Sequence, residues 1–163
     1  MKKIIFLDID GVMNNEVMYE LNPAYQQKRN EIDPKCIKHL NDLIKDTSAE
    51  VVISSVWRYN MDIEALQTIF NNEGFIGKII DKTPVLRSEY TVRGNEILAW
   101  IKNNEELLGQ PYYNFRNYVI FDDDSDMLYW QKDNFICVDS YSGLTARNVY
   151  KATYILNSTY MER

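Results

Sequence analysis

Short apolar runs that end in acidic or hydroxyl residues limit the possible folds of this chain more than any other feature of its sequence. Residues 3–9 (KIIFLDI) contain the first run, and the runs at 51–53 and 118–121 are followed directly by Ser54 and Asp122. None of them alternates between apolar and polar residues. This pattern is typical of strands that are covered on both faces, as in a parallel sheet.

Helical segments separate these runs along the chain. Asp33-Pro34 is a helix start, with an N-cap acid followed by proline at the first helical position. Further helices are predicted after Asp62, over 94–104 and over 145–156, and further strands over 78–81 and 135–138. Strands that alternate with helices predict an α/β fold in which helices cover both faces of a parallel sheet.

Polar residues follow four of the predicted strands: Asp8, Ser54, Asp122 and Asp139. The carboxyl ends of parallel strands line one crevice, which is where such sheets bind ligands. We therefore expect these four segments to converge on a single site.

Size and composition describe one soluble domain over residues 1–163. Lys and Arg number 18 against 24 Asp and Glu, so the net charge is −6. This acidic balance argues against non-specific nucleic-acid binding but leaves room for a local basic pocket. No apolar run approaches the ~18–20 residues of a membrane span, and the first run is too short for a signal peptide. We expect a cytoplasmic protein that does not bind membranes.

The residue types available for catalysis are few. His39 is the only histidine, which excludes multi-histidine metal sites, and Cys36 and Cys137 form no CxxC pair that would hold zinc. We interpret the two cysteines as reduced core thiols. Any chemistry in this chain must therefore be carried by carboxylates.

Two acidic motifs are placed to supply carboxylates for catalysis. Residues 8–12 (DIDGV) would direct Asp8 into the crevice, while the loop through Gly11 brings Asp10 back over it. Residues 122–126 (DDDSD) hold four acids that repel one another unless a cation lies among them, and Mg²⁺ with its hard oxygen ligands is the natural partner. The alternatives are an ordinary turn for the first motif and a solvated acidic helix start for the second.

Two further motifs are suited to an anion. In residues 54–58 (SSVWR), a hydroxyl of Ser54 or Ser55 would donate to a phosphoryl oxygen and Arg58 would add a charged fork. Arg93 stands at a predicted helix start, where free backbone N–H groups also favour an anion. The alternative interpretation is helix capping with solvated arginines. Lys82 and Arg87 are weaker candidates.

These four motifs, in this order between residues 4 and 126, resemble the haloacid dehalogenase (HAD) superfamily. Asp10, the second aspartate, marks a phosphotransferase-type member. The strings 54–58 (SSVWR), 93–100 (RGNEILAW) and 143–145 (GLT) resemble HAD domains of RNA-repair proteins and, more distantly, the phosphatase half of phage polynucleotide kinase-phosphatase. The resemblance implies a Rossmann-like HAD fold.

The resemblance also implies residue roles. Asp8 would be the nucleophile that forms an aspartyl-phosphate, and Asp10 would act as general acid and then general base. Ser54 would hold the phosphoryl group, with Ser55 and Arg58 as further substrate-binding residues. Arg93 would occupy the place where the superfamily more often has lysine. Mg²⁺ would be held by Asp8, the backbone carbonyl of Asp10, and Asp122 or Asp123.

HAD proteins usually choose their substrates with an inserted cap. Here the inserts at 13–33 and 74–92 are too short for a globular cap, so we expect an open cleft that admits a polymer end or is closed by another subunit. Residues of the first insert would contact a base or sugar, or else form a solvated loop: Tyr19, Tyr25, Lys28 and Arg29.

The leading prediction is a Mg²⁺-dependent phosphatase acting on a nucleotide or nucleic-acid end phosphate. Two alternatives remain open. One is a phosphatase of small metabolites such as sugar phosphates, which the acidic net charge favours. The other is a protein that binds and sequesters a nucleotide signal without turnover. The sequence leaves the oligomeric state open.

Overall fold

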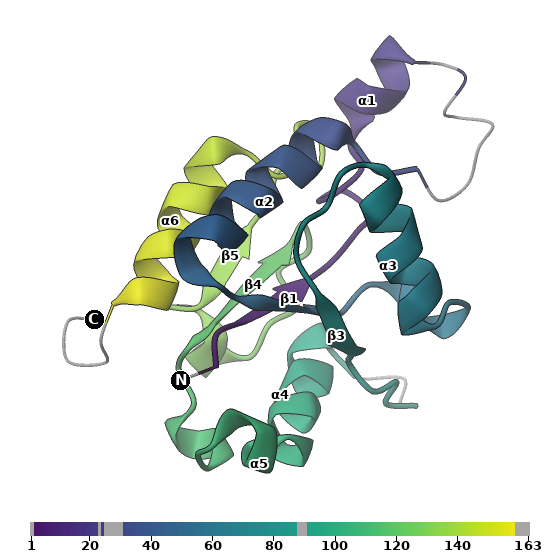
Figure 1. The fold of residues 1–163 in the computed structure, drawn as a ribbon. Helices are drawn as coiled ribbons and strands as arrows, with labels where there is room; N and C mark the ends of the chain where they lie inside the picture. Colours follow the sequence, from purple (N-terminus) through teal and green to yellow (C-terminus); the bar gives the residue numbers. More distant parts are fainter. Residues whose placement is uncertain (1, 23, 25–30, 88–90, 159–163) are drawn as a thin grey trace.

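A computed structural model describes residues 2–22, 24, 31–87 and 91–158, which form five strands and six α-helices (Figure 1). Tyr25, Lys28 and Arg29 of the first insert lie outside the described residues. The strands are β1 (Ile4–Leu7), β2 (Glu50–Ile53), β3 (Ile79–Lys82), β4 (Tyr118–Asp122) and β5 (Phe135–Cys137). The helices are α1 (Glu16–Leu21), α2 (Pro34–Thr47), α3 (Ile63–Asn72), α4 (Arg93–Asn103), α5 (Glu105–Leu108) and α6 (Ala146–Asn157).

The strands form one parallel sheet in the order β3-β2-β1-β4-β5. The central strand β1 pairs with β2 on one side and β4 on the other, so that Phe6 lies opposite both Val52 and Ile120. All four residues of β1 are fully buried. The parallel sheet predicted from the apolar runs is confirmed, and so is the Rossmann-like fold that the resemblance implied.

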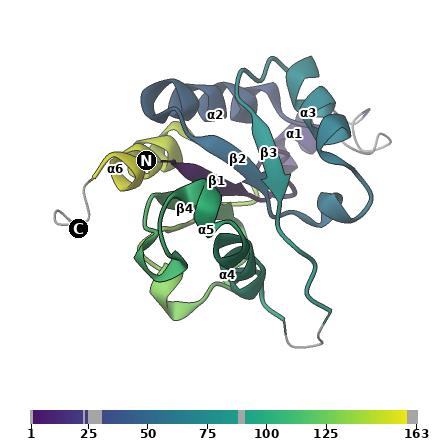
Figure 2. The same cartoon turned by 60° about the horizontal axis from the view of Figure 1, so that its bottom comes forward.

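Helices cover both faces of the sheet, as predicted (Figures 1 and 2). On one face Leu40 of α2, Leu66 of α3 and Ala152 of α6 belong to the same core cluster as Leu7. On the other face Trp100 of α4 packs edge-on against Phe6, with ring centroids 5.4 Å apart. This packing fixes the first turn of α4 relative to the strand ends.

Most of the α-helix starts follow the expected capping chemistry. The carboxylates of Asp33 and Asp62 each accept a hydrogen bond of 2.8 Å from a backbone N–H in the first turn of their own helix. Helix α4 begins after Val92 and has no cap of this kind. Instead, Asp126, which follows β4, accepts the Arg93 N–H at 2.8 Å. The start of α4 is thereby attached to the acidic loop.

The two inserts contain little regular structure. Helix α1 lies within residues 13–33 and β3 within 74–92, and the described parts of neither insert form a separate cap domain. The sequence did not predict α1 or α5, because six and four residues are too few to show a helical period. None of the described helices is long and apolar enough to cross a membrane.

Candidate active site

Three carboxylates meet at the carboxyl ends of β1 and β4. One oxygen from each of Asp8, Asp122 and Asp123 lies within 4.8 Å of the other two. The pairing of Leu7 with Phe121 brings the ends of the two strands side by side, and the Asp8 N–H donates to the Phe121 carbonyl at 3.0 Å. Hydrogen bonding between neighbouring strands therefore assembles this cluster.

Burial makes the cluster electrostatically costly. It raises the pKa of Asp8 to about 6 and, with the nearby Asp8 charge, the pKa of Asp122 to about 7. Burial also raises the pKa of Asp123, while the positive charge of Arg93 lowers all three. The Oδ2 atom of Asp122 is buried without a hydrogen-bond partner. Three converging hard oxygen donors of this kind fit a Mg²⁺ ion.

Gly11 allows the loop after β1 to pass directly over Asp123. Its φ angle is +75°, and a Cβ atom there would lie 2.4 Å from the Asp123 Oδ2. Any other residue would both strain the backbone and displace the Asp123 carboxylate. The DIDGV motif therefore requires glycine because a side chain there would collide with Asp123 of the second acidic motif.

Both oxygens of Asp10 are held by hydrogen-bond donors. Asn14 Nδ2 donates to Oδ1 at 2.8 Å and Trp57 Nε1 donates to Oδ2 at 3.0 Å. Asn14 in turn accepts the Gly11 N–H at 3.0 Å. The orientation of the Asp10 carboxylate is set from two separate segments. These roles of Asn14 and Trp57 could not be predicted from the sequence, because neither contact has a periodic signal.

The two serines after β2 differ in their partners. Ser54 and Ser55 are both fully buried. A hydrogen bond from Ser55 to Asp8 favours the charged form of that carboxylate, and Ser55 Oγ also accepts the Trp57 N–H at 3.4 Å. Ser54 Oγ has no partner at all. A buried hydroxyl without a partner is uncommon in proteins and is available to a ligand.

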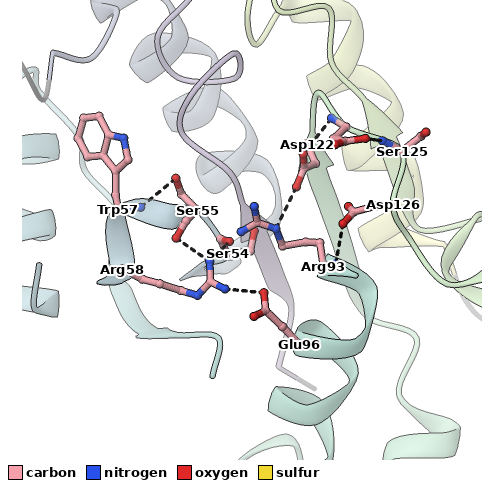
Figure 3. A network of polar contacts seen from close by, with 10 residues as sticks. Ser54, Ser55, Trp57, Arg58, Arg93, Glu96, Asp122, Ser125 and Asp126 are labelled. Atoms are coloured by element: carbon pink, nitrogen blue, oxygen red, sulfur yellow. Dashed lines mark hydrogen bonds and ion pairs between the residues drawn. The ribbon is translucent and has the colours of Figure 1, made fainter. Parts of the chain in front are cut away.

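Arg93 points from the start of α4 toward the carboxylates (Figure 3). Its Nε lies 3.7 Å from Asp122 Oδ2, which is a loose ion pair, and its Nη1 is buried without a hydrogen-bond partner. The side chain therefore presents an unused charged donor beside the acidic cluster.

Arg58 has a different environment from the open substrate contact that we expected (Figure 3). It is only 2% exposed, and its Nη1 donates to the Ser54 and Ser55 carbonyls at 2.5 and 2.7 Å. Its Nη2 donates to Glu96 of α4 at 2.5 Å. Although its Nε is buried without a partner, its charge is balanced by Glu96. Arg58 thus connects the turn after β2 to α4.

The remaining candidates lie outside the carboxylate cluster. Asp126 caps α4, and Asp139 accepts the Tyr141 N–H at 3.1 Å in the turn after β5. Lys82 donates to the carbonyls of Arg58 and Met61. Arg87 is exposed and lines a hollow at the end of β3. Of the three acids expected at the strand ends, Asp8 and Asp122 join the cluster found among the described residues, and Asp139 does not.

A family model for the HAD domain in Swiss Army Knife RNA repair proteins matches residues 4–149. The chain belongs to this family. HAD domains are in general hydrolases of the phosphatase type. Searches of curated proteins and of solved structures gave no match.

The late motif of this HAD domain serves the loop that carries Asp8 and Asp10. Gly143 has a φ angle of +65°, and a Cβ atom there would lie 2.9 Å from both Asn15 Nδ2 and Cys36 Sγ. The next residue, Leu144, donates its N–H to the Val12 carbonyl at 2.8 Å. Residues 143–145 therefore pack against the loop after β1 and hold it in place.

Proposed function

We propose that this HAD domain is a Mg²⁺-dependent phosphomonoesterase that acts on the end phosphate of a nucleotide or nucleic acid. The observation that carries the proposal is one juxtaposition. Three carboxylates that need a cation lie beside Arg93, whose Nη1 is buried without a partner. Ser54, whose Oγ is also buried without a partner, follows β2 and donates its N–H to the carbonyl of Leu7, the residue before Asp8. A phosphate monoester with a divalent cation satisfies both groups at once.

In the proposed reaction, a carboxylate oxygen of Asp8 forms a bond to phosphorus. The bond from phosphorus to the leaving oxygen breaks, and that oxygen takes a proton from Asp10. Asp10 then removes a proton from a water molecule, which attacks phosphorus and releases inorganic phosphate and free Asp8. The contacts from Asn14 and Trp57 support this role, because they hold the Asp10 carboxylate in one orientation.

Asp8, Asp122 and Asp123 would hold the Mg²⁺ ion. When bound, the ion neutralises the negative charge that two or three carboxylates and a phosphate bring into one site. Ser54 and Arg93 would contact the non-bridging phosphoryl oxygens. Arginine keeps its charge at every working pH, so Arg93 would position and neutralise the phosphoryl group without exchanging protons.

Two observations favour a nucleic-acid end over a sugar phosphate. The described residues contain no cap domain that would enclose a small substrate. The matching family is a HAD domain in RNA repair proteins, which favours a nucleic-acid substrate.

The test is a phosphate-release assay with and without Mg²⁺. The panel contains 3′- and 5′-phosphorylated oligonucleotides, mononucleotides and sugar phosphates, with Asp8→Asn as the inactive control. We expect release from oligonucleotides or nucleotides only with Mg²⁺. Faster release from sugar phosphates would favour the metabolite phosphatase, and tight nucleotide binding without release from any substrate would favour a sequestering protein.

A further inference from the structure

A groove of about 390 Å³ lies beside α4, away from the residues of the proposed reaction. It is bordered by α4, by the segment that precedes β4 and by the short turn Tyr129–Gln131. We call it the aromatic groove after three of the residues that line it, Tyr112, Tyr113 and Trp130.

The side chains of the aromatic groove combine rings with positive charge. Trp130 is 63% exposed and Tyr113 is 59% exposed, so both rings are accessible to a ligand. Lys102 and Arg116 also line the groove, and Lys102 Nζ lies 4.7 Å above the Tyr112 ring. None of the described lining residues is acidic, although the chain as a whole has a net charge of −6.

The groove is joined structurally to the start of α4. Gln131 Nε2 donates to the Gly94 carbonyl at 3.0 Å, and a Cβ atom at Gly94 would lie 2.5 Å from Gln131 Oε1. The turn that carries Trp130 is therefore packed against the helical turn that carries Arg93. Lys102 stands nine residues further along the same helix, about 14 Å from Arg93 at ~1.5 Å per residue. On α4 the groove is lined by Leu98, Ile101 and Lys102, so it lies along the second half of the helix, beyond the turn that carries Arg93.

We propose that the aromatic groove binds the body of a single-stranded nucleic acid. Bases would stack on Trp130 and Tyr113, while Lys102 and Arg116 contact phosphates. Exposed rings with interspersed cations are what sequence-tolerant single-strand binding requires. Placing the end of the strand at Arg93 rests on the proposed function. Binding of the strand body in the groove does not, because binding needs no turnover.

Charge decides between a nucleic acid and an apolar protein partner. The nearby Glu105 accepts the Tyr112 N–H and is not among the residues that line the groove. A groove with two cations and no acid among its described lining residues is complementary to a polyanion.

The test measures the anisotropy of fluorescent ten-nucleotide RNA and DNA strands with hydroxyl ends, titrated with the full chain in EDTA. We expect Trp130→Ala and Tyr113→Ala each to weaken binding about tenfold. Lys102→Ala should reduce the slope of log affinity against log salt concentration by an amount that corresponds to about one phosphate contact. Trp130→Phe keeps a ring and should retain most of the affinity. The matched control is Tyr150→Ala, an exposed tyrosine on α6 across the sheet.

Tighter binding to RNA than to DNA would indicate that the 2′-hydroxyl is read, and equal binding would indicate stacking and phosphate contacts alone. Either result supports the groove if Trp130→Ala is impaired. The proposal would be overturned if Trp130→Ala and Tyr150→Ala both bound with the wild-type affinity. It would also be overturned if the wild type bound no strand at low salt. If strands bind through Trp130 but no phosphate is released, the groove stands and the proposed function fails.

Discussion

Arg58 and Arg93 have the same side chain and the same predicted role, but their surroundings are opposite. Arg58 is almost fully buried, and its two terminal nitrogens donate to two carbonyls and to Glu96. Arg93 has one loose contact of 3.7 Å with Asp122, and its Nη1 has no partner. One guanidinium is used by the fold, and the other is available to a ligand.

The two arginines are connected through α4. Arg93 and Glu96 lie three residues apart on α4, so they share a face of the helix. By holding Glu96, Arg58 fixes α4 relative to the turn that carries Ser54 and Ser55. We interpret Arg58 as a positioning residue for Arg93 and the serines.

The largest expected effect is on stability. Arg58→Met should lower the free energy of unfolding by about 3–5 kcal/mol, because Glu96 would stay buried with an unpaired charge. Urea denaturation measures this loss, and the double variant Arg58→Met/Glu96→Leu should recover most of it. A single variant that unfolds like the wild type but loses phosphatase activity would make Arg58 a substrate contact instead.

Arg93→Ala should have the converse effect. We expect kcat/KM for phosphate release to fall about 10²–10³-fold, since a buried charged donor to the phosphoryl group is removed. The free energy of unfolding should change by less than about 1 kcal/mol, and Arg93→Lys should restore part of the activity. The comparison fails if Arg93→Ala destabilises the fold as much as Arg58→Met while activity is kept.

The buried acids near Arg93 predict a pH dependence. In the absence of Mg²⁺, Asp8 and Asp122 have pKa values of about 6 and 7, above their ordinary 3.8, because of burial. Between about pH 4 and 7 the folded chain therefore binds more protons at these groups than the unfolded chain does. The free energy of unfolding should decrease over this range as pH rises, by an amount on the order of several kcal/mol.

Paired urea denaturations of the wild type and Asp122→Asn in EDTA isolate this contribution. The difference between the two curves should change across the pH range, and a flat difference would contradict the assignment. Mg²⁺ competes with protons for the same oxygens, so it should stabilise the wild type more at about pH 8 than at about pH 5.

Substitutions of Asp123 and Asp126 test the metal site and the cap on α4 independently. Asp123→Ala should weaken Mg²⁺ binding tenfold or more in calorimetric titration, because its oxygen belongs to the carboxylate cluster. Asp126→Ala should leave the Mg²⁺ affinity nearly unchanged and cost about 0.5–2 kcal/mol of stability through the lost cap on α4. Metal affinity that depends on Asp126 alone would place the ion elsewhere.

The smallest effect concerns Asp10. Trp57→Phe removes one of the two donors that orient its carboxylate. We expect kcat to fall by about tenfold or less with KM nearly constant, since the second donor, Asn14, remains. A loss in KM alone would indicate that Trp57 contacts the substrate instead.

The sequence predicted the features that arise from local pattern. The parallel strands with helices between them were predicted from the apolar runs, and the approach of Asp8 to Asp122 was predicted from the position of each acid at a strand end. The starts of α2 and α3 could be predicted because Asp33 and Asp62 cap their own helices. Each of these features depends on a few neighbouring residues or on one strand end.

Features that depend on distant side chains could not be predicted. Arg58 and Glu96 are 38 residues apart, and Trp57 and Asp10 are 47 apart. No period or motif connects such pairs, so the sequence alone leaves open whether an arginine is buried against an acid or faces a ligand. Asp139 follows a strand like Asp8, but its carboxylate accepts a hydrogen bond within its own turn.

The central claim is that Asp8 becomes covalently phosphorylated at the site that Arg93 completes. Turnover of a phosphorylated oligonucleotide with Mg²⁺ is stopped in acid, and the chain is then digested and analysed by mass spectrometry. We predict one phosphoryl group on the peptide that contains Asp8 in the wild type, retained but reduced in Arg93→Ala, and none in Asp8→Asn. Phosphate release that proceeds at the wild-type rate in Asp8→Asn, or a phosphoryl group on another residue, would contradict the account.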